Sequence, residues 1–206
     1  MASGPPVLVD PEISRGKLGR EIAAWRSNER EYRARGWLLL DHDDLTVELG
    51  FLGRIPLGNG QAPILLPAIR LDYENYDLWP TSLTFIDPFT REPAPAPLPQ
   101  ALIVGDAGPR NILLQNGEGK HFLCVPGTRE FHDHPQHSGE PWALFRSRKM
   151  GSLAVVAERV WQSMTQTIQG IALQPALLQQ IQIQLRAQQI PPEILQQMLG
   201  QAQNAA

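Results

Sequence analysis

The sequence comprises 206 residues, of which 42% are hydrophobic, and it carries a formal net charge of −3. This length suffices for one domain with extensions, and the composition is typical of a soluble globular protein. The slight negative charge, with Lys and Arg scattered along the chain, argues against a nucleic-acid partner. One cysteine cannot form an internal disulfide, and the chain shows neither a signal peptide nor an apolar run long enough to span a bilayer. We therefore expect a cytoplasmic protein with no membrane partner.

The first half of the chain predicts an N-terminal helix followed by an antiparallel meander. Residues 1–13 contain Pro and Gly and are expected to form an extended arm. Ser14 is a suitable cap for a helix over residues 14–33, and Gly36 a suitable stop. The helix is indicated by apolar residues that recur on one face: Leu18, Ile22 and Trp25. Strand-like segments follow, separated by turn residues: 37–40, 45–52, 64–71 and 82–85.

The second half predicts short apolar segments, a loop and one clear core helix. The proline-rich residues 91–99 are expected to form a surface connection, and His132–His134 a loop. Apolar residues at helical spacing predict a buried helix over residues 152–169. Beyond it, residues 170–206 are rich in Gln, and two amphipathic helices are predicted there, over 175–189 and 192–201. Residues 14–169 would then form the domain, between the arm and a helical extension.

The functional interpretation depends on the stretch FLCVPGTREFHDHPQHSG, residues 122–139, which contains the single cysteine, Cys124. A solitary cysteine is commonly a small buried hydrophobe. Here Val125, Pro126 and Gly127 interrupt regular structure directly after it, so the sulfur lies at the end of an element, where functional residues are common. Cys124 is therefore a candidate nucleophile or a candidate metal ligand. These roles exclude each other, because a thiolate bound to zinc cannot attack an acyl group.

A set of residues in a fixed order resembles the ubiquitin-conjugating enzyme family. That family has a Tyr-Pro-x-x-Pro-Pro-x-x-x-Phe segment, then a His-Pro-Asn tripeptide, and a catalytic cysteine eight residues after the Asn. The first motif is matched by Tyr76, Pro80 and Phe85, and the other two by Asn116 and Cys124. The resemblance covers roughly residues 14–169 and implies an α+β fold of the ubiquitin-conjugating type, an antiparallel meander flanked by helices.

The sequence also departs from this pattern. Leu114 and Gln115 stand where the family has His and Pro, Asp77 replaces the first Pro of the first motif, and the C-terminal helices have no counterpart. These departures indicate a divergent, bacterial member of the family.

The resemblance implies a mechanism without a cofactor. Cys124 would accept a ubiquitin-like protein as a thioester from an activating enzyme and pass it to an amine of a protein target. The side-chain amide of Asn116 would stabilise the oxyanion. The resemblance further implies that the first helix docks on the activating enzyme, through Arg15, Lys17 and Arg20, although a solvated helix face explains these residues equally well. From the residues themselves, His132 or His134 is suited to orient the amine or to take its proton.

Two other interpretations stay open. The same stretch contains enough ligands for a tetrahedral zinc site: Cys124, Glu130, His132, His134 and His137. Their order resembles a bacterial family, predicted to bind metal, that accompanies ubiquitin-like systems. Alternatively, the missing His-Pro pair would permit a catalytically inactive scaffold that only binds partners, with a buried and unreactive Cys124.

Overall fold

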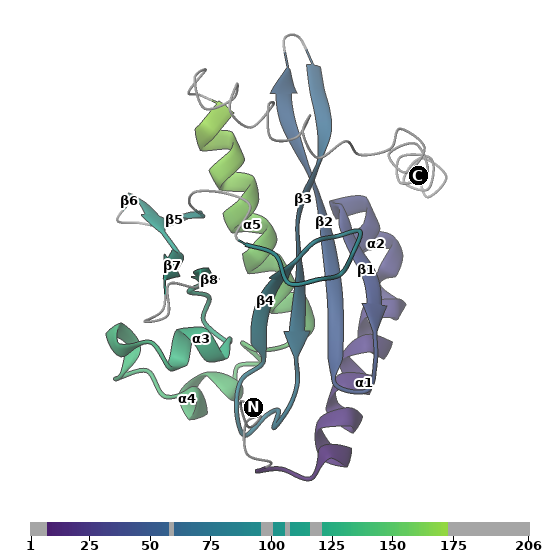
Figure 1. Ribbon diagram of the computed structural model, residues 1–206, viewed down its shortest axis with the longest axis vertical. Helices are drawn as coiled ribbons and strands as arrows, with labels where there is room; N and C mark the ends of the chain where they lie inside the picture. The colour runs from purple at the N-terminus through teal and green to yellow at the C-terminus, as the bar shows by residue number, and fades with distance from the viewer. Residues whose placement is uncertain (1–7, 58–59, 96–100, 106–107, 116–120, 173–206) are drawn as a thin grey trace.

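A computed structural model describes residues 8–57, 60–95, 101–105, 108–115 and 121–172. The described chain is a mixed α+β structure built on a four-stranded antiparallel sheet in the order β1-β2-β3-β4. Figure 1 shows helix α1 beside the sheet, helix α5 behind it, and the small elements that follow the sheet gathered beyond β4. The predicted α+β class and antiparallel meander are thus confirmed. No helix within these described ranges is long and apolar enough to cross a membrane.

The N-terminal helix is broken into two. Helix α1, Pro11–Ser27, begins three residues before the predicted start, because the Asp10 side chain accepts from the Glu12 amide and serves as the cap. Ser14 lies inside the helix instead, where its hydroxyl donates to the Tyr76 carbonyl over 3.0 Å. After Asn28 the chain continues as α2, Glu29–Arg35. The predicted single helix over 14–33 is therefore wrong in its boundaries and its continuity.

Gly36 ends α2 as predicted, in the left-handed region with φ of 87°. Its carbonyl accepts from the Leu52 amide over 2.6 Å, which holds the helix end against the sheet. A Cβ atom here would lie 2.6 Å from the Leu52 carbonyl oxygen. Both the backbone angle and the close approach require glycine at this position.

The sheet is formed by β1, Trp37–His42, β2, Thr46–Leu57, β3, Gly60–Asp72, and β4, Ser82–Ile86. Bulges between Leu39 and Asp41, and between Leu49 and Phe51, shift the register of β2 against its neighbours. Side chains alternate between the two faces of the sheet. In β2, Val47 and Leu49 point into the core, whereas Glu48 points to the opposite face.

The core lies between this inner face of the sheet and the helices. Helix α5, Leu153–Ala172, confirms the predicted core helix. The Trp161 indole donates to the Leu52 carbonyl over 3.3 Å, and Glu21 of α1 accepts from the Leu153 amide, so that α1 caps the start of α5. The predicted apolar face of α1 and the inward face of α5 are buried together: Leu18, Ile22, Trp25, Leu153, Val156, Val160 and Met164.

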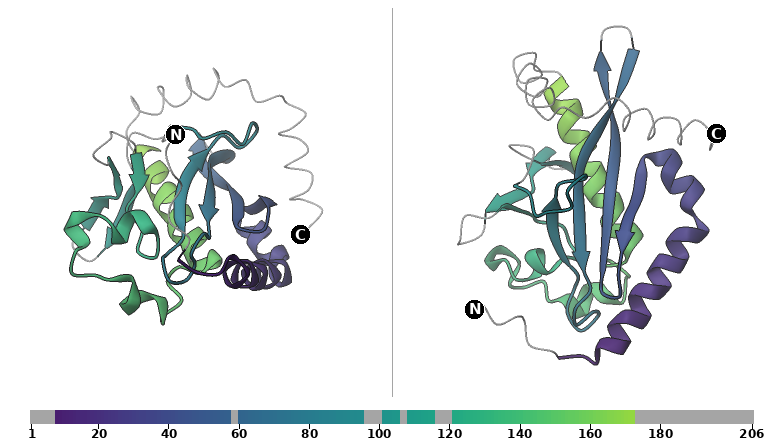
Figure 2. Two further views of the ribbon diagram at one scale, coloured as in Figure 1. Left: turned by 60° about the horizontal axis from the view of Figure 1, so that its bottom comes forward. Right: turned by 45° about the vertical axis from the view of Figure 1, so that its right-hand side comes forward.

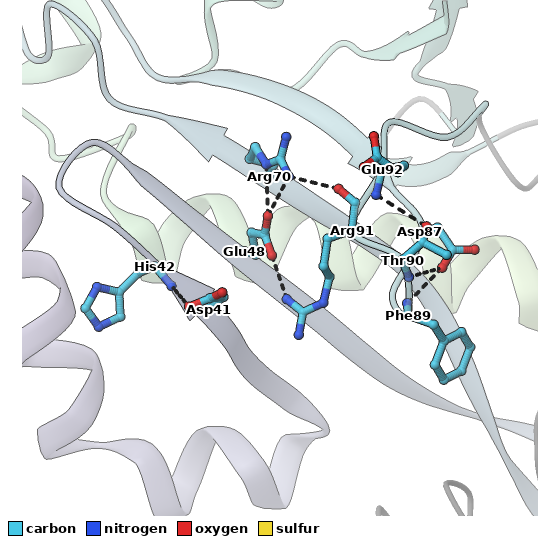
Figure 3. A network of polar contacts seen from close by, with 9 residues as sticks. All are labelled: Asp41, His42, Glu48, Arg70, Asp87, Phe89, Thr90, Arg91 and Glu92. Carbon is cyan, nitrogen blue, oxygen red and sulfur yellow. Dashed lines mark hydrogen bonds and ion pairs between the residues drawn. The ribbon is translucent and has the colours of Figure 1, made fainter.

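Residues 87–92, which follow β4, lie over part of the outer face of the sheet (Figure 3). Glu48 of β2 lies opposite Arg70 of β3 and accepts two hydrogen bonds from its guanidinium, at 2.9 and 2.7 Å. The Arg91 side chain reaches the other carboxylate oxygen over 2.6 Å, and the Arg91 carbonyl accepts from Arg70. One carboxylate and two cations therefore fasten this segment to the sheet. The rest of the predicted proline-rich connection, residues 96–99, lies outside the described residues.

The remaining elements lie beside β4 (Figure 2). They are two small two-stranded sheets and two short helices: β5, Leu102–Gly105, β6, Gly108–Asn111, β7, Leu113–Gln115, β8, His121–Leu123, α3, Arg129–His132, and α4, Trp142–Arg146. The prediction that His132–His134 form a loop is wrong at its start, because His132 ends α3. The two predicted C-terminal helices lie outside the described residues.

Candidate functional site

Cys124 follows the last residue of β8, as the sequence predicted for the end of an element. Its amide donates to the Ile112 carbonyl over 2.7 Å, which extends the pairing of β7 and β8 by one step. The residue is only 5% exposed. The chain then turns sharply at Gly127, where φ is 101° and a Cβ atom would collide with the Met150 carbonyl. The sulfur is therefore fixed between a hairpin and a tight turn.

Helix α3 is held by the beginning of β4. Thr128 forms a bridge with Thr81, and the Arg129 amide donates to the Thr81 carbonyl over 2.8 Å. The Glu130 carboxylate accepts from the Ser82 hydroxyl and, at 3.1 and 3.2 Å, from the Leu83 amide. These contacts hold the helix so that Phe131 is buried in the core.

His137 is returned to Cys124 by a short 3-10 turn, Pro135–His137. Its ring stacks on Phe131, with the centroids 3.7 Å apart. Nε2 of His137 lies 3.2 Å from the Cys124 sulfur, and Nδ1 lies 3.1 Å from the Glu140 carboxylate. The imidazole of His137 therefore lies between the thiol and the carboxylate. The tautomer that fits both contacts has the thiol donating to Nε2 and Nδ1–H donating to Glu140.

The surroundings keep the thiol neutral at rest. Burial raises the pKa of the Cys124 thiol; the positive charge of Arg110 opposes this effect, and the negative charge of Glu140 adds to it. A thiol needs to lose its proton before it acts as a nucleophile. Because the thiolate is disfavoured here, an adjacent proton acceptor is needed for the reaction, and the imidazole of His137 stands where one is required.

His132 and His134, the histidines predicted to manage the amine, lie around this line. Nδ1 of His132 is 2.8 Å from the Glu140 carbonyl oxygen, and its ring packs edge-on against Trp142 and Phe145. Burial lowers the pKa of His132, against the opposite effect of that hydrogen bond. Nδ1 of His134 accepts from the Gln136 amide over 3.3 Å and so caps the 3-10 turn. In this arrangement both histidines support the loop that carries His137 and Glu140.

The five candidate zinc ligands do not converge. Within the described ranges, no three His, Cys, Asp or Glu side chains are grouped closely enough to hold a metal ion. Glu130 is directed to β4, and burial raises its pKa although the bonds from Ser82 and Leu83 oppose this. His132 is directed to the backbone of Glu140. The geometry pairs Cys124 with His137 alone among the predicted ligands.

Other predicted residues can be placed as follows. Asn116, the predicted oxyanion donor, lies outside the described residues, so that role stays a prediction. The first predicted motif packs at the base of the site: Tyr76, Pro80 and Phe85 are buried, and the Asp77 carbonyl accepts from the Trp142 indole over 2.9 Å. This segment therefore connects α1, β4 and α4.

The predicted docking residues on α1 differ in their surroundings. Lys17 forms an ion pair with Asp77, and Arg15 forms one with Glu12, so both are engaged within the protein. Arg20 is exposed. Of the three, Arg20 is the side chain best placed to meet a partner.

Sequence reasoning missed Glu140 and considered His137 only as a metal ligand. A signal was present, since Pro135 and the Ser138–Gly139 pair indicate consecutive tight turns. Such turns appear in the structure, where the His137 amide donates to the His134 carbonyl and the Glu140 amide to the His137 carbonyl, each over 2.8 Å. This places His137 and Glu140, three residues apart, side by side.

The described chain is thus an α+β protein with a buried thiol, an imidazole and a carboxylate in line at the end of a small hairpin. A family model described as Y4jH-like, Y4jH family, matches residues 9–109 and 109–168. The chain belongs to this family. It is 34% identical over 172 residues to a protein of Sinorhizobium fredii named "Uncharacterized protein y4jH", an alignment that spans 74% of this chain and 82% of the relative. The relative is bacterial, as the sequence led us to expect for the chain itself.

Proposed function

We propose that this protein is a conjugating enzyme of the ubiquitin-like type, which carries a ubiquitin-like protein as a thioester on Cys124. The single observation on which the proposal depends is the Cys124 sulfur beside an imidazole, 3.2 Å away. Attack by the sulfur on an acyl carbonyl needs the thiol proton to leave, and this contact provides the acceptor.

The order of the elements also supports the proposal. An N-terminal helix precedes a four-stranded meander, the cysteine follows the meander, and a buried tryptophan, Trp142, precedes the core helix. This is the order that the resemblance implies. Tyr76 and Pro80 are buried between β3 and β4, where the Tyr76 ring lies near Trp142 of α4, and Phe85 is buried within β4. The partners would be an activating enzyme, the ubiquitin-like protein and a protein target in the bacterial cytoplasm.

The test is to incubate the protein with a candidate activating enzyme, its ubiquitin-like protein and ATP. We expect an adduct that a reducing agent removes, and none with Cys124→Ala. Cys124→Ser should give an ester adduct that withstands the reducing agent but not alkali, because oxygen replaces sulfur in the bond. If the activating enzyme forms its own thioester in the same tube and this protein does not become charged, the proposal is wrong.

The second candidate, an inactive scaffold that binds partners, is favoured by one observation, the 5% exposure of Cys124. The two candidates differ in the chemistry of the thiol. Titration of the native protein with a thiol reagent, combined with elemental analysis of the same sample, separates them. Prompt modification of the native protein supports the nucleophile. A thiol that reacts only after unfolding supports the scaffold, and one equivalent of zinc with a thiol masked until chelator is added would support a metal-binding role.

A further inference from the structure

We propose that Cys124, His137 and Glu140 form a general-base relay that gives the protein an acyl-transfer activity of its own, the hydrolysis of small activated esters. This inference depends on the nucleophilic role of Cys124 in the proposed function. It does not depend on a ubiquitin-like partner, because the three side chains are already in place in the isolated chain.

The relay has the connectivity that nucleophilic catalysis requires. Nε2 of His137 faces the sulfur at 3.2 Å and Nδ1 faces Glu140 at 3.1 Å, so that one ring nitrogen is free to accept a proton while the other is held as a donor. The carboxylate fixes the tautomer and stabilises the imidazolium that forms during the reaction. The His137 side chain is 13% exposed and that of Glu140 is 46% exposed, so the relay leads from the buried sulfur to solvent.

The loop that carries the relay is supported on two sides. Phe131 stacks on one face of the His137 ring and, being buried, restricts its rotation. His132 binds the Glu140 carbonyl and so fixes the backbone from which the carboxylate projects. His134 caps the turn that places His137. These contacts make His132 and His134 positioning residues, whereas the proton moves through His137.

The reaction proceeds in two steps. In the first, the Cys124 sulfur attacks the ester carbonyl, Nε2 of His137 takes the thiol proton, a C–S bond forms and the C–O bond to the leaving group breaks. The imidazolium gives this proton to the leaving oxygen, or to solvent when the group leaves as an anion such as nitrophenolate, so Nε2 is free again before the second step. In the second, water attacks the thioester, giving its proton to Nε2, and the C–S bond breaks. The thiolate then recovers a proton, and the products are a carboxylic acid and an alcohol or phenol.

The experiment uses the full chain and 4-nitrophenyl acetate. We expect a burst of nitrophenolate equal to the enzyme concentration, followed by slower turnover, and neither with Cys124→Ala. His137→Gln should slow the burst by about 100-fold or more, the range for loss of a general base. Glu140→Gln should slow it by at least about tenfold through a misdirected imidazole. His42→Asn, which removes an exposed imidazole at the end of β1 and outside this loop, is the matched control and should react as the wild type does.

The pH profile gives a readout that a structural role would not change. The burst of the wild type should level off once the imidazole is neutral, because His137 then takes the thiol proton. The burst of His137→Gln should keep rising with pH, because it depends on ionisation of the Cys124 thiol, whose pKa burial raises. Glu140, His132 and His134 surround His137, and Arg110 acts on Cys124, so each is a charge that can shift the profile.

The outcomes are distinct. No burst from folded wild-type protein, or equal bursts from the wild type, His137→Gln and Glu140→Gln, would overturn the relay. Glu140→Gln keeps this test valid if His137→Gln does not fold, since the Glu140 side chain is half-exposed. A normal burst without charging by the ubiquitin-like protein would overturn only the proposed function. Charging without any burst would overturn only the relay.

Discussion

Replacement of His132 by Phe tests whether this half-buried histidine is a positioning residue. The ring contacts Trp142 and Phe145 edge-on, at centroid distances of 5.4 and 4.8 Å, and a phenyl ring occupies the same place with little change in packing. Nδ1 binds the Glu140 carbonyl, whereas Nε2 is buried with no hydrogen-bond partner among the described residues. His132→Phe therefore removes one satisfied and one unsatisfied polar atom.

At pH 8 the two effects on the free energy of unfolding nearly cancel. The lost hydrogen bond is worth about 1 kcal/mol, and a buried unpartnered nitrogen costs about 1–3 kcal/mol. We expect the variant to be as stable as the wild type or more stable by about 1 kcal/mol. The ester burst should nevertheless slow, because Glu140 loses its backbone anchor.

At lower pH the variant should gain stability relative to the wild type. Burial lowers the pKa of His132 in the folded protein, whereas the unfolded chain titrates near the ordinary value of about 6.5. Between these two pKa values the unfolded chain binds more protons, so the wild type loses stability as the pH falls from about 6.5 towards the folded pKa. The variant has no titrating ring at this position and therefore lacks this loss.

Urea unfolding of the wild type and of His132→Phe at several pH values between 8 and 5 measures how their difference in free energy of unfolding changes with pH. Burial raises the pKa values of Glu21 and Glu130, so the stability that these residues contribute is lost as the pH rises through their folded pKa. Both proteins contain these two residues, so their contribution cancels in the difference between the proteins. Phe145→Leu, which weakens packing on the same ring without removing a titrating group, should show a difference that is constant with pH. A constant difference for His132→Phe would refute the reasoning.

Three further predictions concern the sheet and α1. Gly36→Ala should destabilise the protein by about 2 kcal/mol in urea unfolding, because a positive φ and a carbonyl at 2.6 Å both oppose a side chain there. Glu48→Ala should lower the free energy of unfolding by about 2 kcal/mol, because Arg70 and Arg91, each about one-third exposed, lose their shared carboxylate. Replacing both Glu48 and Arg70 by apolar residues should lower it by less than the sum of the two single changes. Arg20→Glu should slow charging by an activating enzyme several-fold without changing Tm, and an unchanged charging rate would place the docking surface elsewhere.

The sheet and the core helices were predictable because their signals are local. Leu18, Ile22 and Trp25 recur at the spacing of one helical face, and the same face is buried in the structure. The break at Asn28 was not predictable from periodicity. There the Asn28 side chain donates to the Ala24 carbonyl, and the helix axis restarts so that α2 can end at Gly36. The position of this break is set by tertiary packing against the sheet.

The helix α3 was missed for the same reason. Residues 129–132 are too few to show helical periodicity, although Arg129 and Glu130 are good helix formers. The helix is held by Arg129 and Glu130, whose partners belong to the start of β4, nearly fifty residues earlier in the chain. Proximity in sequence also favoured His132 and His134 over His137 as the residue that serves Cys124. The turn at Pro135 reverses that order, because it brings the more distant histidine back to the sulfur.

The proposed nucleophilic role of Cys124 rests on this turn. Here burial raises the pKa of the thiol, and a single imidazole faces it, itself oriented by a carboxylate. In the proposed function this thiol stays protonated until a carbonyl group arrives, and its proton leaves as the C–S bond forms. A carrier of a reactive acyl group benefits from this arrangement, since a thiolate exposed at rest would react with other electrophiles first.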